Sequence, residues 1–137
     1  MKMGEGEQRP LNFLVATDMH VGHRSENLGV QHDSYVALEE VLATAREKQV
    51  DFLLLGGDLF DEVNPAKDCY HRTLAIMSKY VMAGERHSPL EVTYEGQPWP
   101  VNFNQGWGVS LPVFTIHGNH DFPNMDNGRI GSCDLLQ

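Results

Sequence analysis

Asp51-Phe52-Leu53-Leu54-Leu55-Gly56-Gly57-Asp58 is the stretch of sequence that decides the fold. Four consecutive large apolar side chains between a charged residue and a glycine pair predict a short strand buried on both faces, as in a parallel sheet. The two glycines lack a Cβ, so the chain can turn sharply where the strand ends and another group can approach closely. Asp58 follows this turn at the carboxyl end of the strand, where ligands bind in open α/β sheets.

Two more apolar stretches end in the same way. Residues 12–17 run into Asp18 and His20, and residues 113–116 run into His117-Gly118-Asn119-His120-Asp121. Because neighbouring parallel strands bring their carboxyl ends to one edge of a sheet, the side chains that follow all three stretches are expected to meet there. The pattern predicts a metal site assembled from residues far apart in the sequence.

Two segments between these strands have helical spacing. Apolar residues recur at i, i+3, i+4 and i+7 from Leu38 to Ala45, after Asp33 or Ser34 as candidate capping residues. A second apolar stripe runs from Tyr70 to Val81, after an Asn-Pro pair typical of a helix start. The order strand, helix, strand, helix, strand predicts an α/β fold made of right-handed βαβ units.

The composition sets limits on the kind of protein. The 137 residues are enough for one domain, and 41% of them are hydrophobic, as in globular proteins. A net charge of -9 argues against a broad, sequence-independent hold on nucleic acid by this piece alone. The two cysteines show no zinc spacing and indicate a reducing compartment. No apolar run approaches the roughly 20 residues of a membrane helix, so no membrane association is expected.

Two segments fall outside the alternation of strands and helices. Residues 1–10 are charged and rich in glycine, without an apolar core, and are expected to form a flexible N-terminus. Residues 85–110 contain four aromatic side chains and are far longer than the usual connection of about 2 to 6 residues. This aromatic-rich insertion is either a surface loop or a platform for a partner, and the sequence leaves both interpretations open.

Four residues are the candidate metal ligands. Asp18 and His20 lie two apart, so on an extended segment both side chains can ligate one cation. Asp58 is the natural bridging carboxylate, because its two oxygens can serve two ions, and Asn119 supplies a neutral oxygen for the second ion. Carboxylate, imidazole and amide oxygen without a thiolate suit Mn²⁺, Fe²⁺ or Zn²⁺.

Three further residues are assigned supporting or chemical roles in the same region. His120 is best kept off the metal, where it can hydrogen-bond a phosphate oxygen or donate a proton to a leaving oxygen. Asp121 is interpreted as the carboxylate that orients His120, or as a turn cap. His117 ends a strand and is interpreted either as a core residue or as a residue that contacts the metal ligands without binding the metal itself.

These motifs resemble those of a known family. Asp18-Met19-His20, Gly56-Gly57-Asp58 and Gly118-Asn119-His120-Asp121 look like the first three motifs of the calcineurin-like metallophosphoesterases. The longer stretches 14–22, 50–60 and 112–121 resemble the nuclease subunits of the MRN/MRX double-strand-break repair complexes. The resemblance covers nearly the whole chain from Leu11. It implies a metallophosphoesterase-type β-sandwich flanked by helices, of which residues 11–137 hold the first βαβαβ portion.

The resemblance also implies an activity. It places two Mn²⁺ ions in the full-length parent, with Asp18 and His20 on the first, Asp58 bridging, Asn119 on the second and His120 near the scissile phosphate. The implied function is a 3'-to-5' exonuclease and single-strand endonuclease in double-strand-break repair and meiotic recombination. The implied partners are DNA, a second copy of the chain, an ABC-type ATPase and a Nbs/Xrs-type adaptor, in the nucleus. The insertion falls where eukaryotic members carry the adaptor loop.

One departure from the family is large. Family members add histidines on later strands, including a Gly-His-x-His type motif that this sequence lacks. The candidate ligands give only five metal bonds: one each from Asp18, His20 and Asn119, and two from Asp58. Two ions need about ten to twelve bonds in total. The sequence is therefore expected to be the N-terminal part of a nuclease, as a fragment or an incomplete gene product, not competent alone.

Two other functions remain as alternatives. Protein Ser/Thr phosphatases share the fold but read Gly-Asp-x-His-Gly, Gly-Asp-x-Val-Asp-Arg-Gly and Gly-Asn-His-Glu. Here Thr17 precedes Asp18, Asp61-Glu62 replaces the basic residue and Asp121 replaces the Glu, so three mismatches argue against this interpretation. A catalytically inactive assembly subunit is the non-enzymatic alternative. It would lack the metals but keep the aromatic loop, the helix expected at residues 64–82 and the segment at residues 129–136, and the resemblance places the last two near the family's dimer contacts.

Overall fold

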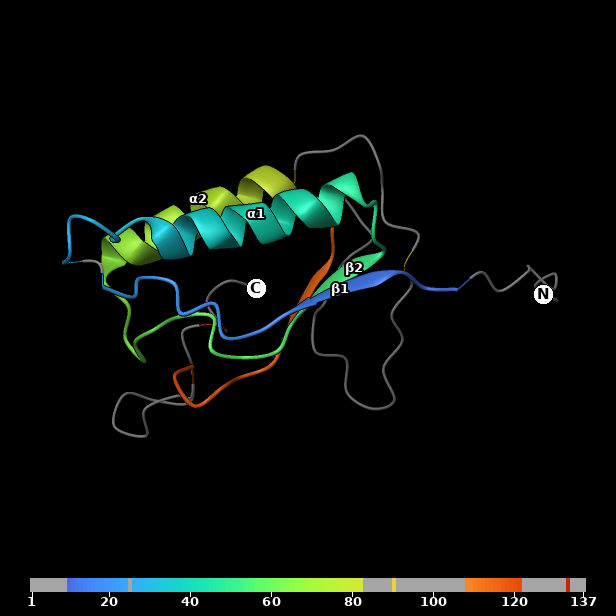
Figure 1. Ribbon diagram of the computed structural model, residues 1–137. Helices are drawn as coiled ribbons and strands as arrows, with labels where there is room; N and C mark the ends of the chain where they lie inside the picture. Colours follow the sequence, from blue (N-terminus) through green and yellow to red (C-terminus); the bar gives the residue numbers. More distant parts are fainter. Residues whose placement is uncertain (1–9, 25, 83–89, 91–107, 122–132, 134–137) are drawn as a thin grey trace, which may run out of the picture.

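The computed structural model describes residues 10–24, 26–82, 90, 108–121 and 133. Strands and helices alternate along the described chain (Figure 1), in the order β1 (Phe13–Ala16), α1 (Asp33–Glu47), β2 (Phe52–Leu55), α2 (Lys67–Val81) and β3 (Val113–Thr115). This alternation confirms the βαβαβ fold expected from the sequence.

The strands form one parallel sheet in the order β1-β2-β3. Phe13 pairs with Phe52 at one end of the β1–β2 ladder, and Ala16 pairs with Leu55 at the other. Leu53 pairs with Val113 at the start of β3. This register brings the carboxyl ends of all three strands to the same edge, so the turns that follow them start side by side.

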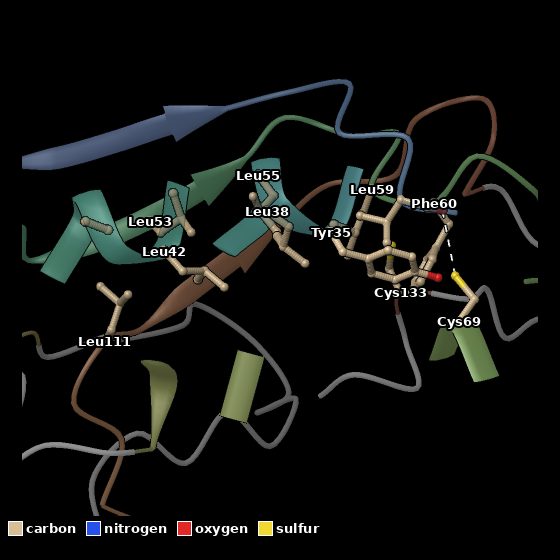
Figure 2. Close-up of a cluster of buried hydrophobic side chains, with 12 residues drawn as sticks. Tyr35, Leu38, Leu42, Leu53, Leu55, Leu59, Phe60, Cys69, Leu111 and Cys133 are labelled. Atoms are coloured by element: carbon tan, nitrogen blue, oxygen red, sulfur yellow. Dashed lines mark hydrogen bonds between the residues drawn. The ribbon is translucent and has the colours of Figure 1, made fainter. Parts of the chain in front are cut away.

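Both helices cover the same face of the sheet (Figure 1). Successive right-handed crossovers that step in one direction leave their helices on one side, which accounts for this arrangement. The core lies between the helices and the sheet. Figure 2 shows it as a continuous group of side chains that includes Leu38 and Leu42 from α1, Leu53 and Leu55 from β2, and Leu111 before β3, all buried.

The other face of the sheet is open over the described residues. Phe13, Val15 and Ile116 are 53%, 54% and 58% exposed, and Phe52 in the central strand is only half-buried. The prediction that β2 is buried on both faces is therefore wrong for the described chain, because α1 and α2 lie on the same side. The aromatic side chains of this face contact one another: the Phe13 and Phe52 rings stack at 5.0 Å, and Phe114 packs edge-on at 5.4 Å.

The helix starts differ from those expected. α1 begins at Asp33 without a side-chain cap, and Ser34 Oγ instead accepts a hydrogen bond from the Gly22 N–H at 3.1 Å. Ser34 therefore ties the helix to the turn after β1. In α2 the fully buried positions are Cys69 and Thr73, and Leu74 is 38% exposed. The buried stripe of α2 is thus displaced by one residue from the one predicted.

Several expectations concern residues outside those described. They are residues 1–9, nearly all of the insertion at residues 85–110, and nearly all of the C-terminal segment at residues 129–136.

Cys69 and Cys133 are free thiols, both buried. Neither described helix is long and apolar enough to cross a membrane.

Candidate metal centre

The turns after β1 and β2 are joined by backbone hydrogen bonds that continue the parallel ladder beyond the strands. Val21 and Phe60 form an isolated parallel bridge, and both side chains are buried in the core. Three N–H groups of the first turn donate to carbonyls of the second: Asp18 to Gly57 at 3.1 Å, His20 to Asp58 at 3.0 Å and Val21 to Leu59 at 2.8 Å. This pairing fixes Asp18 and His20 beside Asp58.

Two buried carboxylates attach the turn after β3 to the turn after β2. Asp58 Oδ1 accepts a hydrogen bond from the His120 N–H at 2.8 Å. The Asp121 side chain, which is fully buried, accepts from the N–H groups of Leu59, Phe60 and Gly118 at 3.2, 3.3 and 3.2 Å. Asp121 thus holds its own turn and the neighbouring turn together.

The glycines of these turns allow the close approach predicted from the sequence. Gly57 has a φ of +104°, and a Cβ on it would lie 2.9 Å from Cα and N of Gly118. A Cβ on Gly118 would lie 2.1 Å from Oδ1 of Asp58. Any side chain at either position would push apart the two turns that Asp58 connects.

Three of the candidate ligand positions have an uncommon backbone conformation. Asp18, His20 and Asp58 have φ values of 55°, 44° and 51°, in the left-handed region that residues with a Cβ rarely adopt. Such strain persists only where surrounding contacts hold it, and it concentrates at functional sites. Here the cross-turn backbone bonds of Asp18, His20 and Asp58 provide those contacts.

Asp18, His20 and Asp58 form one group that could hold a cation. One ligand atom from each residue lies within 4.8 Å of the others. Two carboxylates and an imidazole suit a divalent cation of the Mn²⁺, Fe²⁺ or Zn²⁺ type, so the residues present fit a first metal. Asn119 lies in the adjacent turn with an exposed side chain. The structure therefore brings the predicted ligands of the first ion together and places Asn119 in the neighbouring turn.

The remaining predicted residues are placed as follows. His120 packs edge-on against His20, with 4.9 Å between the ring centroids, and its Nδ1 lies 2.5 Å from the Asp61 carbonyl oxygen. The Asp121 carboxylate accepts hydrogen bonds from backbone N–H groups, one of them in its own turn. His117 is exposed, so the interpretation of it as a core residue is wrong: β3 ends at Thr115, and His117 lies in the turn beyond.

Sequence reasoning missed Asp61 as part of this region. Its carboxylate lies 3.0 Å from Nδ1 of His20 and 3.1 Å from Nδ1 of His23. His20, Asp61 and His120 also form a second group whose ligand atoms lie within 4.8 Å of one another. The position of Asp61 three residues after Asp58 is visible in the sequence, but the pairing of its turn with the turn that carries His20 is visible only in the structure.

Comparison with known proteins agrees with this geometry. Residues 11–135 match the calcineurin-like phosphoesterase family, and the chain belongs to that family. The chain is also similar to proteins named double-strand break repair protein MRE11. It is 40% identical to the human protein over 126 residues, which is 85% of this chain and 18% of that protein. The rice (japonica) protein is 38% identical over 141 residues, covering 98% of this chain and 20% of its own length.

A nematode relative gives the same result. The Caenorhabditis elegans protein named double-strand break repair protein mre-11 is 38% identical over 137 residues, 92% of this chain and 18% of that protein. The chain therefore spans about a fifth of the length of these relatives.

Proposed function

We propose that this chain is the N-terminal part of a Mn²⁺-dependent DNA nuclease that acts in double-strand-break repair and meiotic recombination. The observation that carries the proposal is the group formed by Asp18, His20 and Asp58, at the carboxyl edge of a parallel sheet in a calcineurin-like phosphoesterase. The names of the relatives point to double-strand-break repair, and the role in meiotic recombination is added from the family resemblance. The expected activities are 3'-to-5' exonuclease and single-strand endonuclease.

In this proposal the chain's own residues bind the cations and the phosphate. Asp18, His20 and Asp58 hold the first divalent cation, Asp58 reaches the second, and Asn119 contributes to the second. Bound divalent cations would offset phosphate charge and activate water as the nucleophile. Carbonyl oxygens only accept hydrogen bonds, so the contact with the Asp61 carbonyl places a hydrogen on Nδ1 of His120. When protonated, His120 then has its Nε2–H to donate to the phosphate or the leaving oxygen.

The chain as it stands is expected to bind Mn²⁺ weakly. The Asp-His-Asp group supplies a partial set of ligands for one ion. Of the candidate ligands named from the sequence, Asn119 is the one left to add to Asp58 at the second ion. Isothermal titration calorimetry of the 137-residue chain should show one weak Mn²⁺ site. Two tight ions per chain would contradict this ligand assignment. Complete absence of Mn²⁺ binding would instead favour the inactive assembly subunit, for which the small number of ligands is the supporting observation.

The proposed partners are those that the family resemblance implies. DNA is the substrate, and a second copy of the chain, an ABC-type ATPase and a Nbs/Xrs-type adaptor complete the assembly, in the nucleus. The adaptor is proposed to bind residues 85–110, whose aromatic side chains are the kind that dominate interfaces.

The test compares two substitutions in the full-length parent, assayed on single-stranded and double-stranded DNA with Mn²⁺. His120→Asn should lower the rate of phosphodiester cleavage by roughly 10²- to 10⁴-fold while metal content and dimerisation persist, because it removes an acid and no ligand. Asp58→Ala should remove bound metal as well as activity. If His120→Asn releases metal as fully as Asp58→Ala, His120 is a ligand and the division of roles is wrong. Cleavage of phosphate monoesters instead of DNA would favour the phosphatase.

A further inference from the structure

Asp61 contacts three histidines through two different groups. Its carboxylate oxygens Oδ1 and Oδ2 lie 3.0 Å from Nδ1 of His20 and 3.1 Å from Nδ1 of His23. Its backbone carbonyl lies 2.5 Å from Nδ1 of His120. In every case the nitrogen that faces Asp61 is Nδ1, so one residue meets the same side of three imidazole rings.

The backbone holds Asp61 in this position independently of its side chain. The Asp61 N–H donates to the Val21 carbonyl at 3.1 Å, in the paired segment where Val21 also bridges Phe60. The carboxylate is 27% exposed, compared with 31% for the His20 side chain and 53% for that of His23. The contact of the Asp61 carboxylate with His20 is therefore less exposed to solvent than its contact with His23.

The chemistry of the acceptor determines the tautomer of each neutral ring. A carboxylate and a carbonyl oxygen only accept hydrogen bonds, so the Nδ1 atoms must carry the hydrogen. In His20 this leaves a lone pair on Nε2, and Nε2 is the atom directed toward Asp18, 4.0 Å from its Oδ1. The two nitrogens of His20 thus face different carboxylates, with Asp61 at Nδ1 and the candidate metal ligand Asp18 at Nε2.

We propose that Asp61 is a positioning residue for the metal centre: its carboxylate fixes His20 as the Nδ1–H tautomer and directs the Nε2 lone pair to the cation. This inference rests on the proposed metal-dependent function. Histidines that bind metals generally donate their other N–H to a carboxylate, a carbonyl or water, and loss of that partner typically weakens metal binding by about 10- to 100-fold.

The competing interpretation is that His20, Asp61 and His120 bind a cation of their own, because their ligand atoms are close enough. Two hydrogen bonds oppose it. Nδ1 of His20 and Nδ1 of His120 each carry the hydrogen that they donate to Asp61, so neither of these two atoms has a lone pair for a metal that Asp61 would share, and only the Nε2 atoms keep lone pairs. The cluster is accordingly a hydrogen-bonded support for the neighbouring group of Asp18, His20 and Asp58.

The first measurement needs no metal. Nitrogen-15 NMR of the metal-free 137-residue chain reports the tautomer of each histidine from the shifts of its two ring nitrogens, at a pH where the rings are neutral. We expect the Nδ1–H form for His20, His23 and His120. Asp61→Ala should move His20 and His23 toward the Nε2–H form that a free imidazole prefers. His120 should not change, because its partner is a backbone carbonyl that the substitution keeps.

The second measurement is the affinity of the same variants for Mn²⁺ by calorimetry. Asp61→Ala should weaken binding by about 10- to 100-fold. Asp61→Asn, which keeps an oxygen acceptor, should restore part of the loss. Glu62→Ala is the matched control, since it removes the same charge from the adjacent exposed residue and should leave both readouts unchanged. His23→Ala should leave the His20 tautomer unchanged. This variant shows whether the contact of Asp61 with His20 acts independently of its contact with His23.

Two results would overturn the inference: a His20 ring that stays in the Nδ1–H form in Asp61→Ala, or an affinity for Mn²⁺ that falls equally in Glu62→Ala. Failure of the proposed function looks different. In that case the wild-type chain binds no Mn²⁺, while the tautomers still respond to Asp61→Ala.

Discussion

At the scale of single residues, the site is held together by carboxylates that accept backbone N–H groups. Asp58 receives the His120 N–H, and Asp121 receives three N–H groups from two turns. These bonds join segments that are about 60 residues apart in the sequence, since Asp121 and Phe60 are separated by 61. One carboxylate therefore positions the candidate ligands that follow two different strands.

Asp121→Ala tests this role. The substitution leaves three N–H groups without their acceptor, and two of them, on Leu59 and Phe60, belong to buried residues. An unsatisfied buried donor costs about 1–3 kcal/mol, so the loss of acceptor for two buried donors should lower the free energy of unfolding by about 2–6 kcal/mol. Urea denaturation measures it. Glu40→Ala, at an exposed position in α1, is the control and should change stability by less than about 0.5 kcal/mol.

At the scale of elements, the two helices are linked to each other at the surface. Lys79 of α2 donates to Oε1 of Glu39 in α1 at 2.5 Å, and the Tyr80 hydroxyl donates to the same oxygen at 2.9 Å. The hydrogen bonds from Lys79 and then Tyr80 lower the pKa of the Glu39 carboxyl below its ordinary value. Because the pair is exposed, solvent and salt weaken it.

The lowered pKa gives a prediction with a definite sign. A carboxyl whose pKa is lower in the folded chain than in the unfolded chain stabilises the fold above its unfolded pKa, and the stabilisation is lost as pH falls through the folded pKa. Wild type should therefore be more stable than Glu39→Gln at pH 7. The difference should begin to shrink as pH falls toward the ordinary Glu pKa, and it should vanish only below the lower pKa of the folded chain. Thermal unfolding of both chains over pH 3–7 measures it. A difference that is constant with pH would contradict the assignment.

Much of the arrangement could be predicted because the ligand residues follow apolar stretches directly. The candidate ligands Asp18, Asp58 and Asn119 each come within a few residues of a strand end, so a parallel sheet alone brings them together. The open face could not be predicted, since the run Phe52–Leu55 is equally apolar whether one face is covered or two. The contacts of Asp61 with the histidines could not be predicted either. They depend on the backbone pairing between the turns after β1 and β2, which continues beyond the ends of the strands.

At the scale of the whole described molecule, the apolar face of the sheet away from the helices is the main surface feature. Leu11, Phe13, Val15 and Ile116 are each more than half exposed there or beside it. Contiguous exposed apolar surface of this kind favours association.

We expect the 137-residue chain to associate as its concentration rises and to bind an apolar fluorescent dye. Val15→Thr, which keeps a β-branched side chain at an exposed strand position, should reduce both effects without loss of folding. Sedimentation velocity and dye fluorescence measure them. Val36→Thr is the control, because Val36 is 60% exposed on α1, away from the sheet face. Equal effects of the two substitutions would show that the face is not the surface responsible.

The ladder that joins the turns after β1 and β2 also sets the order of events when the chain folds. His20 and Asp61 are separated by 41 residues, and Asp58 and His120 by 62, so the contacts at the centre close only over long loops. Long-range closure is slow, and little of the coordination geometry exists before the strands pair. A divalent cation added during refolding should therefore act late, slowing the unfolding rate without speeding the folding rate. On a ribosome, Asp18 and His20 emerge long before Asp58, and the group of Asp18, His20 and Asp58 cannot assemble until β2 has joined β1.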